Sequence, residues 1–202
     1  MGSKRYVNGF AVTIHDDLFE EPLSWKKPRL VFVNSMSDLF HESIPEEVIQ
    51  RLFTVMESAP MHTFQILTKR AERLAEIAQR LPWPKNIWMG VTVEADQFSG
   101  RIDLLREVPA AIRFVSFEPL LTRINPSVSL EEIDWVIVGG ESGPGARDMK
   151  EPWVVGIQDL CRKYQTSFFF KQWGGVNKKQ NGRELQGKTW DEMPNQVPVF
   201  AF

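Results

Sequence analysis

The 202-residue sequence contains a single cysteine, Cys161, and this scarcity excludes two kinds of site. One thiol cannot close an internal disulfide, and it cannot by itself supply a cysteine-based metal site. Cys161 shares one face of a helical stretch with Val154, Ile157 and Tyr164, so we expect a buried core thiol. Because disulfides are rare in reducing compartments, the lack of a disulfide pattern is typical of a cytoplasmic protein.

The sequence also lacks long apolar runs and a strong excess of one charge. No apolar run approaches the roughly 18 residues of a membrane-spanning helix, so we expect no membrane partner. The formal net charge of −2 argues against a protein that coats nucleic acid, although the local basic stretch KQWGGVNKKQNGR leaves nucleic acid open as a partner. The three histidines, His15, His41 and His62, have no metal-ligand spacing, and we expect no metal site.

Short apolar runs alternate with amphipathic stretches along the chain. Six runs are β-branched or aromatic and nearly continuous, which is the pattern of strands buried on both faces of a parallel sheet. The six expected strands are LVFVN (30–34), TFQIL (63–67), IWMGV (87–91), RFVSF (113–117), WVIVG (135–139) and SFFFK (167–171). Helical periodicity occupies the stretches 43–58, 69–81, 97–108 and 151–164.

This order of strands and helices predicts an α/β fold with a parallel sheet. A closed eight-stranded barrel usually takes about 250 residues, so the six units indicate an incomplete TIM-type (β/α) barrel with about six strands. An open doubly wound sheet is the alternative. We expect one α/β domain over 1–202, with an N-terminal extension (1–29), the β/α units (30–174) and a C-terminal tail (175–202).

Polar or ionisable residues follow every expected strand. In parallel α/β folds the carboxyl ends of the strands meet at one edge, where ligands bind, so we expect a polar ligand pocket there. The residues at these ends are Asn34, Ser35, Asp38, Lys69, Arg70, Glu94, Glu118, Gly139, Gly140, Glu141, Ser142, Lys171 and Gln172. The alternative is that each of them only ends its strand, because loops are polar and solvated.

Lys171, Glu118 and Asp38 are the candidates for catalysis within this set. Lys171 ends an aromatic strand, where a lysine either pairs with a carboxylate or meets a substrate. Glu118 precedes Pro119, and a residue before proline favours extended backbone, which directs its side chain toward the edge. An acid–base enzyme that uses Lys171 and Glu118 is one hypothesis. An ion pair between the same two residues is the structural alternative.

The stretch VIVGGESGPG (136–145) raises the question of a ligand-binding loop. It lacks the lysine and the serine or threonine of a P-loop, but consecutive glycines let backbone N–H groups approach a ligand closely. Glu141 would repel a phosphate, so a ligand with hydroxyls or an ammonium group fits better. We expect this loop to form one wall of the pocket. The expected cofactor-binding residues are Asn34, Ser35, Lys69, Arg70, Glu94, Gly139, Gly140, Glu141, Ser142 and Gln172.

Six motifs occur in order between about Arg5 and Gly174: KKPRLVFVNSMSDLFHESIP, TFQILTKR, IWMGVTVE, RFVSFEPLL, DWVIVGGESGPGARDM and FFFKQWGG. Together they resemble a phage- and prophage-associated family of unknown function that is related to radical S-adenosylmethionine proteins. The resemblance implies S-adenosylmethionine and an iron–sulfur cluster as cofactors of full-length members. In those members, three cysteines on a loop upstream of the matched region hold the cluster.

This chain has only Cys161, so as it stands it cannot ligate such a cluster. The resemblance therefore implies a radical-enzyme-like partial barrel that is inactive as a radical enzyme in this form. The alternative is a non-catalytic module that binds a ligand or a protein partner. By analogy with relatives of similar fold, the resemblance also implies a small polar or nucleotide-like ligand.

Overall fold

The computed structural model describes residues 12–34, 37–176 and 181–194. Its centre is one sheet of six strands, and all six strands expected from the sequence are present. They are β1 (Leu30–Val33), β2 (Thr63–Thr68), β3 (Ile87–Thr92), β4 (Ile112–Phe117), β5 (Trp135–Gly139) and β6 (Ser167–Gln172). Neighbouring strands in the sheet are neighbours in sequence, and every pair is parallel.

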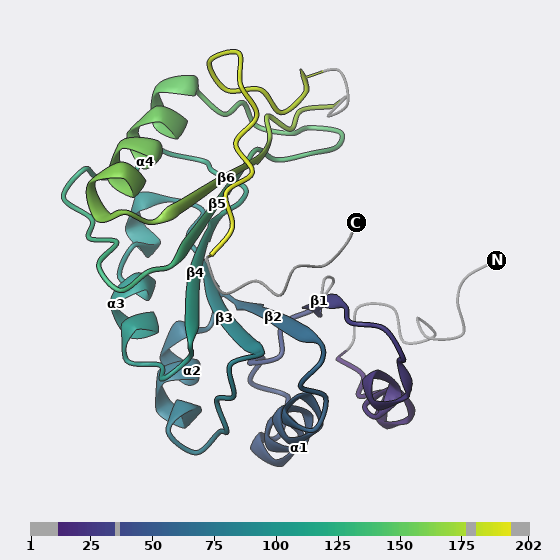
Figure 1. Cartoon of the computed structure of the whole chain (residues 1–202). Helices are drawn as coiled ribbons and strands as arrows, with labels where there is room; N and C mark the ends of the chain where they lie inside the picture. The colour runs from purple at the N-terminus through teal and green to yellow at the C-terminus, as the bar shows by residue number, and fades with distance from the viewer. Residues whose placement is uncertain (1–11, 35–36, 177–180, 195–202) are drawn as a thin grey trace.

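The strand order decides between the two expected architectures. A doubly wound sheet reverses its strand order at a switch point and carries helices on both faces. Here the order runs from β1 to β6 without reversal, so crossovers of one hand place the helices on one face. Figure 1 shows the sheet curled into a half-barrel with the helices on its outer side. The incomplete barrel is confirmed, and the open doubly wound alternative is wrong.

Four α-helices connect the strands: α1 (Glu46–Glu57), α2 (Ala71–Ala78), α3 (Arg101–Arg106) and α4 (Glu151–Tyr164). The third is shorter than the periodic stretch 97–108, because part of that stretch forms the 3₁₀ helix η4 (Asp96–Phe98) instead. Between residue 12 and β1, the structure has two further 3₁₀ helices, η2 (Asp16–Leu18) and η3 (Glu21–Ser24). Among the described helices, none combines the length and the apolar character needed to cross a membrane.

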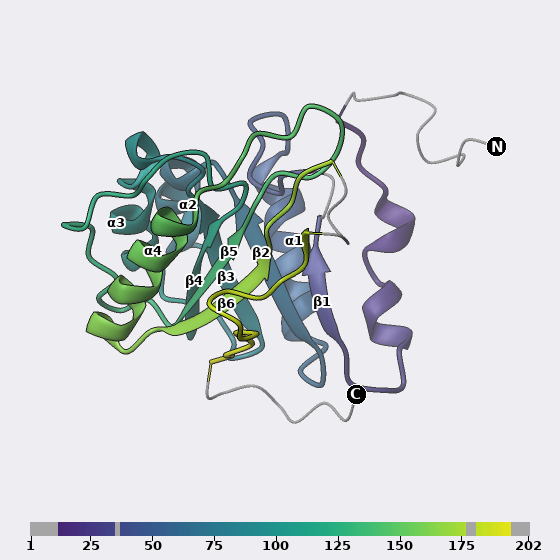
Figure 2. The same ribbon diagram turned by 90° about the horizontal axis from the view of Figure 1, so that it is seen from above.

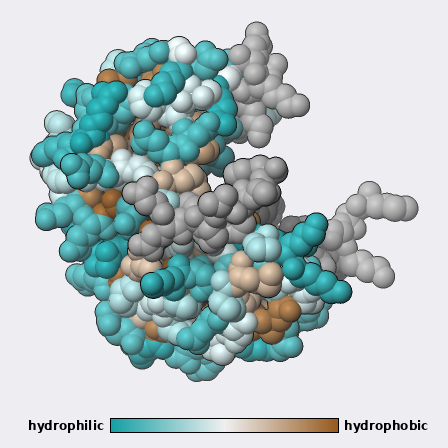
Figure 3. Space-filling model, viewed as in Figure 1, coloured by the Kyte–Doolittle hydropathy of each residue, from teal (hydrophilic) through white to brown (hydrophobic). Residues whose placement is uncertain are grey.

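Two hydrophobic clusters lie on the two faces of the sheet. The larger one packs the outer face of the strands against the helices and includes Ile66, Met89, Val136, Leu74 and Ile157. The smaller one lies on the inner face and consists of Trp88, Ile112, Phe114 and Trp135. Gly90 provides the space for this inner cluster, since a Cβ there would lie 2.4 Å from the Phe114 ring. Hydrophilic residues cover most of the described surface visible in Figure 3.

The chain beyond β6 returns along the free edge of that strand. Phe170 N donates to Trp190 O over 2.9 Å, and Glu192 N donates to Phe168 O over 3.3 Å. Phe169 and Asp191 form an antiparallel bridge. Seen from above, this segment runs beside β6 (Figure 2). It therefore occupies backbone groups that an edge strand otherwise leaves unpaired.

Candidate functional site

Two glutamates lie side by side at the carboxyl edge of the sheet. Thr92 on β3 and Ser116 on β4 are register partners, and Glu94 and Glu118 each follow two residues later. Adjacent strands are about 4.8 Å apart, so the backbones of both glutamates belong to one row of the edge. The peptide bond between Glu118 and Pro119 is cis.

Lys171 of β6 forms an ion pair with Glu118. Its Nζ lies 3.0 Å from Oε1 and 3.1 Å from Oε2 of the glutamate. The side chains are 52% and 23% exposed, respectively, so the carboxylate is largely covered while the ammonium group stays open to solvent. The ion pair expected from the sequence is therefore present, and a catalytic role for either residue stays a prediction.

The local backbone explains how this pair spans a strand. Val138 pairs with Phe170 and Gly139 pairs with Gln172, so Lys171 is the extra residue of a β-bulge. A bulge changes the direction of a side chain at the end of a strand. In addition, a Cβ at Gly139 would lie 3.0 Å from Glu118 Oε1 and 3.1 Å from its Cδ. The missing side chain at Gly139 therefore leaves the space into which the Glu118 carboxylate extends.

Glu94 has two cationic partners. Its side chain is 10% exposed, and Oε2 accepts a hydrogen bond from Arg101 Nη1 over 2.9 Å. The same Nη1 donates to Thr92 O over 2.6 Å, and Lys69 Nζ forms an ion pair with Glu94 Oε1. A nearly buried carboxylate requires such partners, because an unpaired charge is costly to remove from water. The Lys69 side chain remains 52% exposed.

Sequence reasoning missed Arg101. It is the first residue of α3 and stands seven positions after Glu94, with the η4 turn between them. Periodicity assigned this segment to a continuous helix, which hid the turn that folds Arg101 back onto the strand end. A cation in the first turn opposes the helix dipole, but the expected stretch 97–108 put Arg101 in the second turn, so the sequence carried no such signal.

Asp38 links the loop after β1 to the end of β2. Its Oδ1 accepts hydrogen bonds from Phe40 N (3.0 Å) and Thr68 Oγ1 (2.7 Å). Its Oδ2 accepts from Lys69 N (3.0 Å) and Arg70 Nη1 (2.9 Å). Four donors therefore engage this carboxylate. At the start of the same loop, Asn34 adopts a φ of 58°.

Gly140, directly after β5, and Gly174, two residues after β6, allow two backbones to pack closely. A Cβ at Gly140 would lie 1.9 Å from Trp173 O, and one at Gly174 would lie 2.2 Å from Glu141 O. Gly140 N donates to Gln172 O over 3.0 Å, and Gly175 N donates to Glu141 O over 2.6 Å. The loop and the segment after β6 thus prolong the β5–β6 pairing beyond the sheet, and the chain itself fills the space that these glycines leave.

Glu141 is held by Arg147 on the same loop. The guanidinium donates from Nε to Oε2 and from Nη2 to Oε1, each over 2.8 Å, and Arg147 N donates to Oε2 over 2.9 Å. These side-chain and backbone hydrogen bonds lower the pKa of Glu141 to about 2. Beside this pair, Gln172 Nε2 donates to Ser142 Oγ over 3.0 Å.

The structure thus gathers the predicted residues into separate contacts along one edge: Asp38 with Arg70, Lys69 with Glu94, Glu118 with Lys171, and Ser142 with Gln172. Ser35 lies outside the described residues. A pocket of about 260 Å³ beside the edge is lined by Asp96, Arg123, Ile124, Asn125 and Pro126, which the sequence did not single out. The binding roles of the predicted residues stay predictions.

The described residues do not fit an iron–sulfur cluster. Within the described ranges, no group of three or more His, Cys, Asp or Glu side chains is placed to hold a metal ion. Cys161 lies in α4 with 2% of its surface exposed, and burial raises the pKa of its thiol. Metal ligation by cysteine needs the thiolate, and a single cysteine cannot provide three of them.

The protein is therefore a parallel-stranded α/β half-barrel whose carboxyl edge carries ion pairs between lysines and glutamates. A family model described as "Protein of unknown function (DUF5131)" matches residues 1–194, and the chain belongs to this family. The match includes all six strands and every candidate residue of the carboxyl edge. No curated protein and no solved structure matches the chain.

Proposed function

We propose that this protein binds a small zwitterionic ligand, which carries both an ammonium group and a carboxylate, at the carboxyl edge of the half-barrel. One observation carries the proposal: Lys69 and Lys171, each 52% exposed, pair with the largely covered carboxylates of Glu94 and Glu118. A ligand carboxylate can bind the exposed lysines, and a ligand ammonium group can bind the glutamates. Both exchanges replace one ion pair by another, so neither leaves a charge unpaired.

S-adenosylmethionine is the first ligand to test, because its methionine part is such a zwitterion. The resemblance to radical S-adenosylmethionine proteins supports this choice. We also propose that the protein is phage-associated and located in the cytoplasm. Since the described residues do not fit the cluster, the proposed function of this chain is binding of a ligand, with or without a protein partner, and no radical step is derived.

Calorimetric titration of the full chain with S-adenosylmethionine, methionine and adenosine tests the proposal. We expect saturable binding of the first two ligands. Lys69→Ala and Lys171→Ala should bind them about 10- to 100-fold more weakly, since one charge-assisted hydrogen bond contributes about 1.5–3 kcal/mol. Lys85→Ala is the control, because Lys85 is exposed before β3, at the amino end of the sheet. The proposed zwitterion site would be overturned if adenosine alone binds, or if neither S-adenosylmethionine nor methionine binds.

An acid–base enzyme is the second candidate, and the contact of 3.0 Å between Lys171 Nζ and Glu118 Oε1 favours it. That separation lies within the range for direct proton transfer. Lys171→Arg separates the two candidates, because arginine keeps the positive charge but does not give up its proton. Conversion of the ligand is followed by mass spectrometry. If Lys171→Arg still binds S-adenosylmethionine but no longer converts the ligand that the wild type converts, the result supports the enzyme. Retained binding with no conversion by either protein supports the binding module.

We propose a positioning role for Asp38 rather than a catalytic one. Its two carboxylate oxygens accept four hydrogen bonds from Phe40, Thr68, Lys69 and Arg70. A carboxylate engaged in this way has to lose a structural contact before it can act on a substrate. Its proposed task is to hold the backbone of Lys69, so that the lysine side chain meets Glu94.

A further inference from the structure

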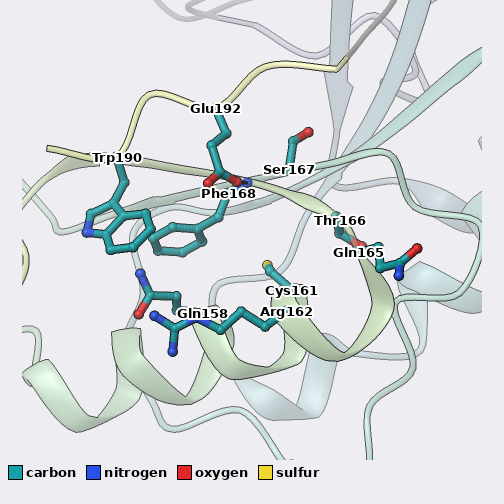
Figure 4. Close-up of a pocket in the computed structure, with 9 residues that line it drawn as sticks. All are labelled: Gln158, Cys161, Arg162, Gln165, Thr166, Ser167, Phe168, Trp190 and Glu192. Carbon is teal, nitrogen blue, oxygen red and sulfur yellow. Dashed lines mark hydrogen bonds between the residues drawn. The ribbon is translucent and has the colours of Figure 1, made fainter.

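A second pocket lies at the opposite, amino end of β6. It has a volume of about 280 Å³ and lies between α4, the start of β6 and the returning segment that contains Trp190 and Glu192 (Figure 4). Ser167, the first residue of β6, lines this pocket, whereas Lys171 of the candidate site stands four residues further along the same strand. At about 3.3 Å per residue, the two places are roughly 13 Å apart along β6.

Gln158 is the unusual residue of this pocket. Its side chain is 1% exposed, and neither Nε2 nor Oε1 has a hydrogen-bond partner in the described part of the chain. Burial of an amide without partners is unfavourable, and leucine or methionine at this point of α4 would avoid the cost. Figure 4 shows the amide directed toward the space beside Trp190 and Phe168. The amide therefore has unused hydrogen-bonding capacity, which a bound molecule can reach once the side chain turns further into the pocket.

The walls of the pocket define which molecule fits. An amide presents one acceptor and one donor side by side, so its complement is a group with an adjacent donor and acceptor, such as N6 and N7 of adenine. The rings of Phe168 and Trp190 meet edge to face, with centroids 6.0 Å apart, and provide an apolar wall. The volume corresponds to about nine water molecules at roughly 30 Å³ each, which suits a ligand of base size.

The charged side chains of the pocket have opposite signs, because Arg162 and Glu192 both line it, so their charges do not favour an ionic ligand. Glu192 lines it and accepts a hydrogen bond from Phe168 N through Oε2 over 2.8 Å, which leaves its other oxygen available. Burial raises the pKa of the Cys161 thiol, and the negative charge of Glu192 raises it further, so the thiol stays neutral. A neutral molecule that carries N–H donors avoids repulsion by this carboxylate.

We infer that this pocket binds a neutral planar heterocycle of nucleobase size, whose adjacent donor and acceptor pair with the amide of Gln158. This site is independent of the proposed zwitterion site at the carboxyl edge. It requires no metal and no residue of that edge.

Titration of the full chain with adenine, cytosine and benzimidazole tests the inference. Adenine and cytosine carry adjacent donors and acceptors, and benzimidazole is the planar control without such a pair. We expect adenine or cytosine to shift the side-chain NH₂ resonances of Gln158 in ¹H–¹⁵N spectra and to bind at least tenfold more tightly than benzimidazole. The absence of a shift up to the solubility limit, or equal affinities for all three, would overturn the inference.

Gln158→Met gives an independent test, because methionine has a similar shape but no amide. We expect at least tenfold weaker binding of adenine and a melting temperature equal to or above that of the wild type. Gln97→Met, at an exposed position of η4, is the control and should change neither adenine binding nor the melting temperature. Unchanged adenine binding in Gln158→Met would contradict the inference. If this variant does not fold, the resonance shift in the wild type decides.

Failure of this site can be distinguished from failure of the zwitterion site. Adenine binding at Gln158 should be unchanged in Lys171→Ala, whereas methionine binding should be unchanged in Gln158→Met. Adenine binding that depends on Lys171 would place the base at the carboxyl edge and would overturn the assignment to Gln158.

Discussion

The ammonium group of Lys171 on β6 lies 3.0 Å from the carboxylate of Glu118, the residue directly after β4, although β5 lies between β4 and β6. Two strands with one other strand between them lie about 9.6 Å apart, so a direct contact needs two long side chains and free space between them. The bulge at Lys171 and the missing side chain at Gly139 supply that space. This pair therefore depends on the ends of three strands at once.

Gly139→Ala should disturb the pair of Lys171 and Glu118 without unfolding the protein. The new methyl group would lie 3.0 Å from Glu118 Oε1, and the flexible carboxylate can move away from it. Because exposed ion pairs contribute about 0–1 kcal/mol, we expect the free energy of unfolding in urea to change by less than about 1 kcal/mol. Binding of S-adenosylmethionine should weaken.

A Glu118→Gln background provides the control for this prediction. Once the carboxylate is replaced, the additional change Gly139→Ala should no longer affect binding through the ion pair, so the two effects should not add. Strictly additive effects in this double-mutant cycle would show that Gly139 acts by another route.

Asp38→Ala should destabilise the protein by about 3 kcal/mol, because it removes an acceptor that is 15% exposed and leaves several donors without a partner. Chemical denaturation measures the loss. Asp17→Ala, an exposed aspartate of η2, is the control and should stay within about 0.5 kcal/mol of the wild type. Wild-type stability of Asp38→Ala would argue against the positioning role and in favour of the catalytic one.

Gly140→Ala should destabilise the loop after β5 by about 2 kcal/mol, since its Cβ would lie 1.9 Å from Trp173 O and one backbone must move. Gly156→Ala provides a matched comparison within α4, where a Cβ has no atom within 4 Å. That change should stabilise the protein by about 0.5–1 kcal/mol, because alanine favours the helix. Similar urea midpoints for both variants would refute the packing role of Gly140.

Arg147→Ala should raise the pKa of Glu141 from about 2 toward its ordinary value of 4.5, which carboxyl NMR shifts recorded against pH can measure. Because the folded-state pKa is lowered, the contribution of this pair to stability is present above about pH 4.5. It is lost as the pH falls toward 2. As the pH falls through this window, the free energy of unfolding should decrease less in Arg147→Ala than in the wild type. A pKa of Glu141 that stays near 2 in the variant would exclude Arg147 as its cause.

Cys161 should be inert toward a disulfide reagent such as DTNB in the folded protein. Its side chain is 2% exposed, and burial raises its pKa, so the reactive thiolate is scarce. The same thiol should react completely in concentrated guanidinium chloride, which is the control for reagent and protein. Rapid reaction under native conditions would show that the α4 side of the second pocket opens in solution.

The alternation of apolar runs and helical stretches was sufficient to predict the strands and a parallel α/β fold, because burial on both faces leaves a local pattern in each strand. The strand order in the structure then selected the incomplete barrel over the open sheet. The same pattern predicted that polar residues gather at the carboxyl ends. It failed at the third helix, where residues with helical spacing form the turn η4 and bring Arg101 to Glu94. Arg101 was missed because a contact seven residues away depends on that turn rather than on periodicity.

The sequence by itself determined the order of the elements. It also determined that Asp38, Glu94, Glu118 and Lys171 lie at the carboxyl edge of the sheet. Only the tertiary structure decided which of their charges meet, because pairing depends on register, on the bulge at Lys171 and on the space at Gly139. It also decided that Gly140 packs against the backbone of Trp173, and that the Gln158 amide is buried without a partner among the described residues. Contacts between distant segments leave no local pattern, so the three-dimensional structure alone contains them.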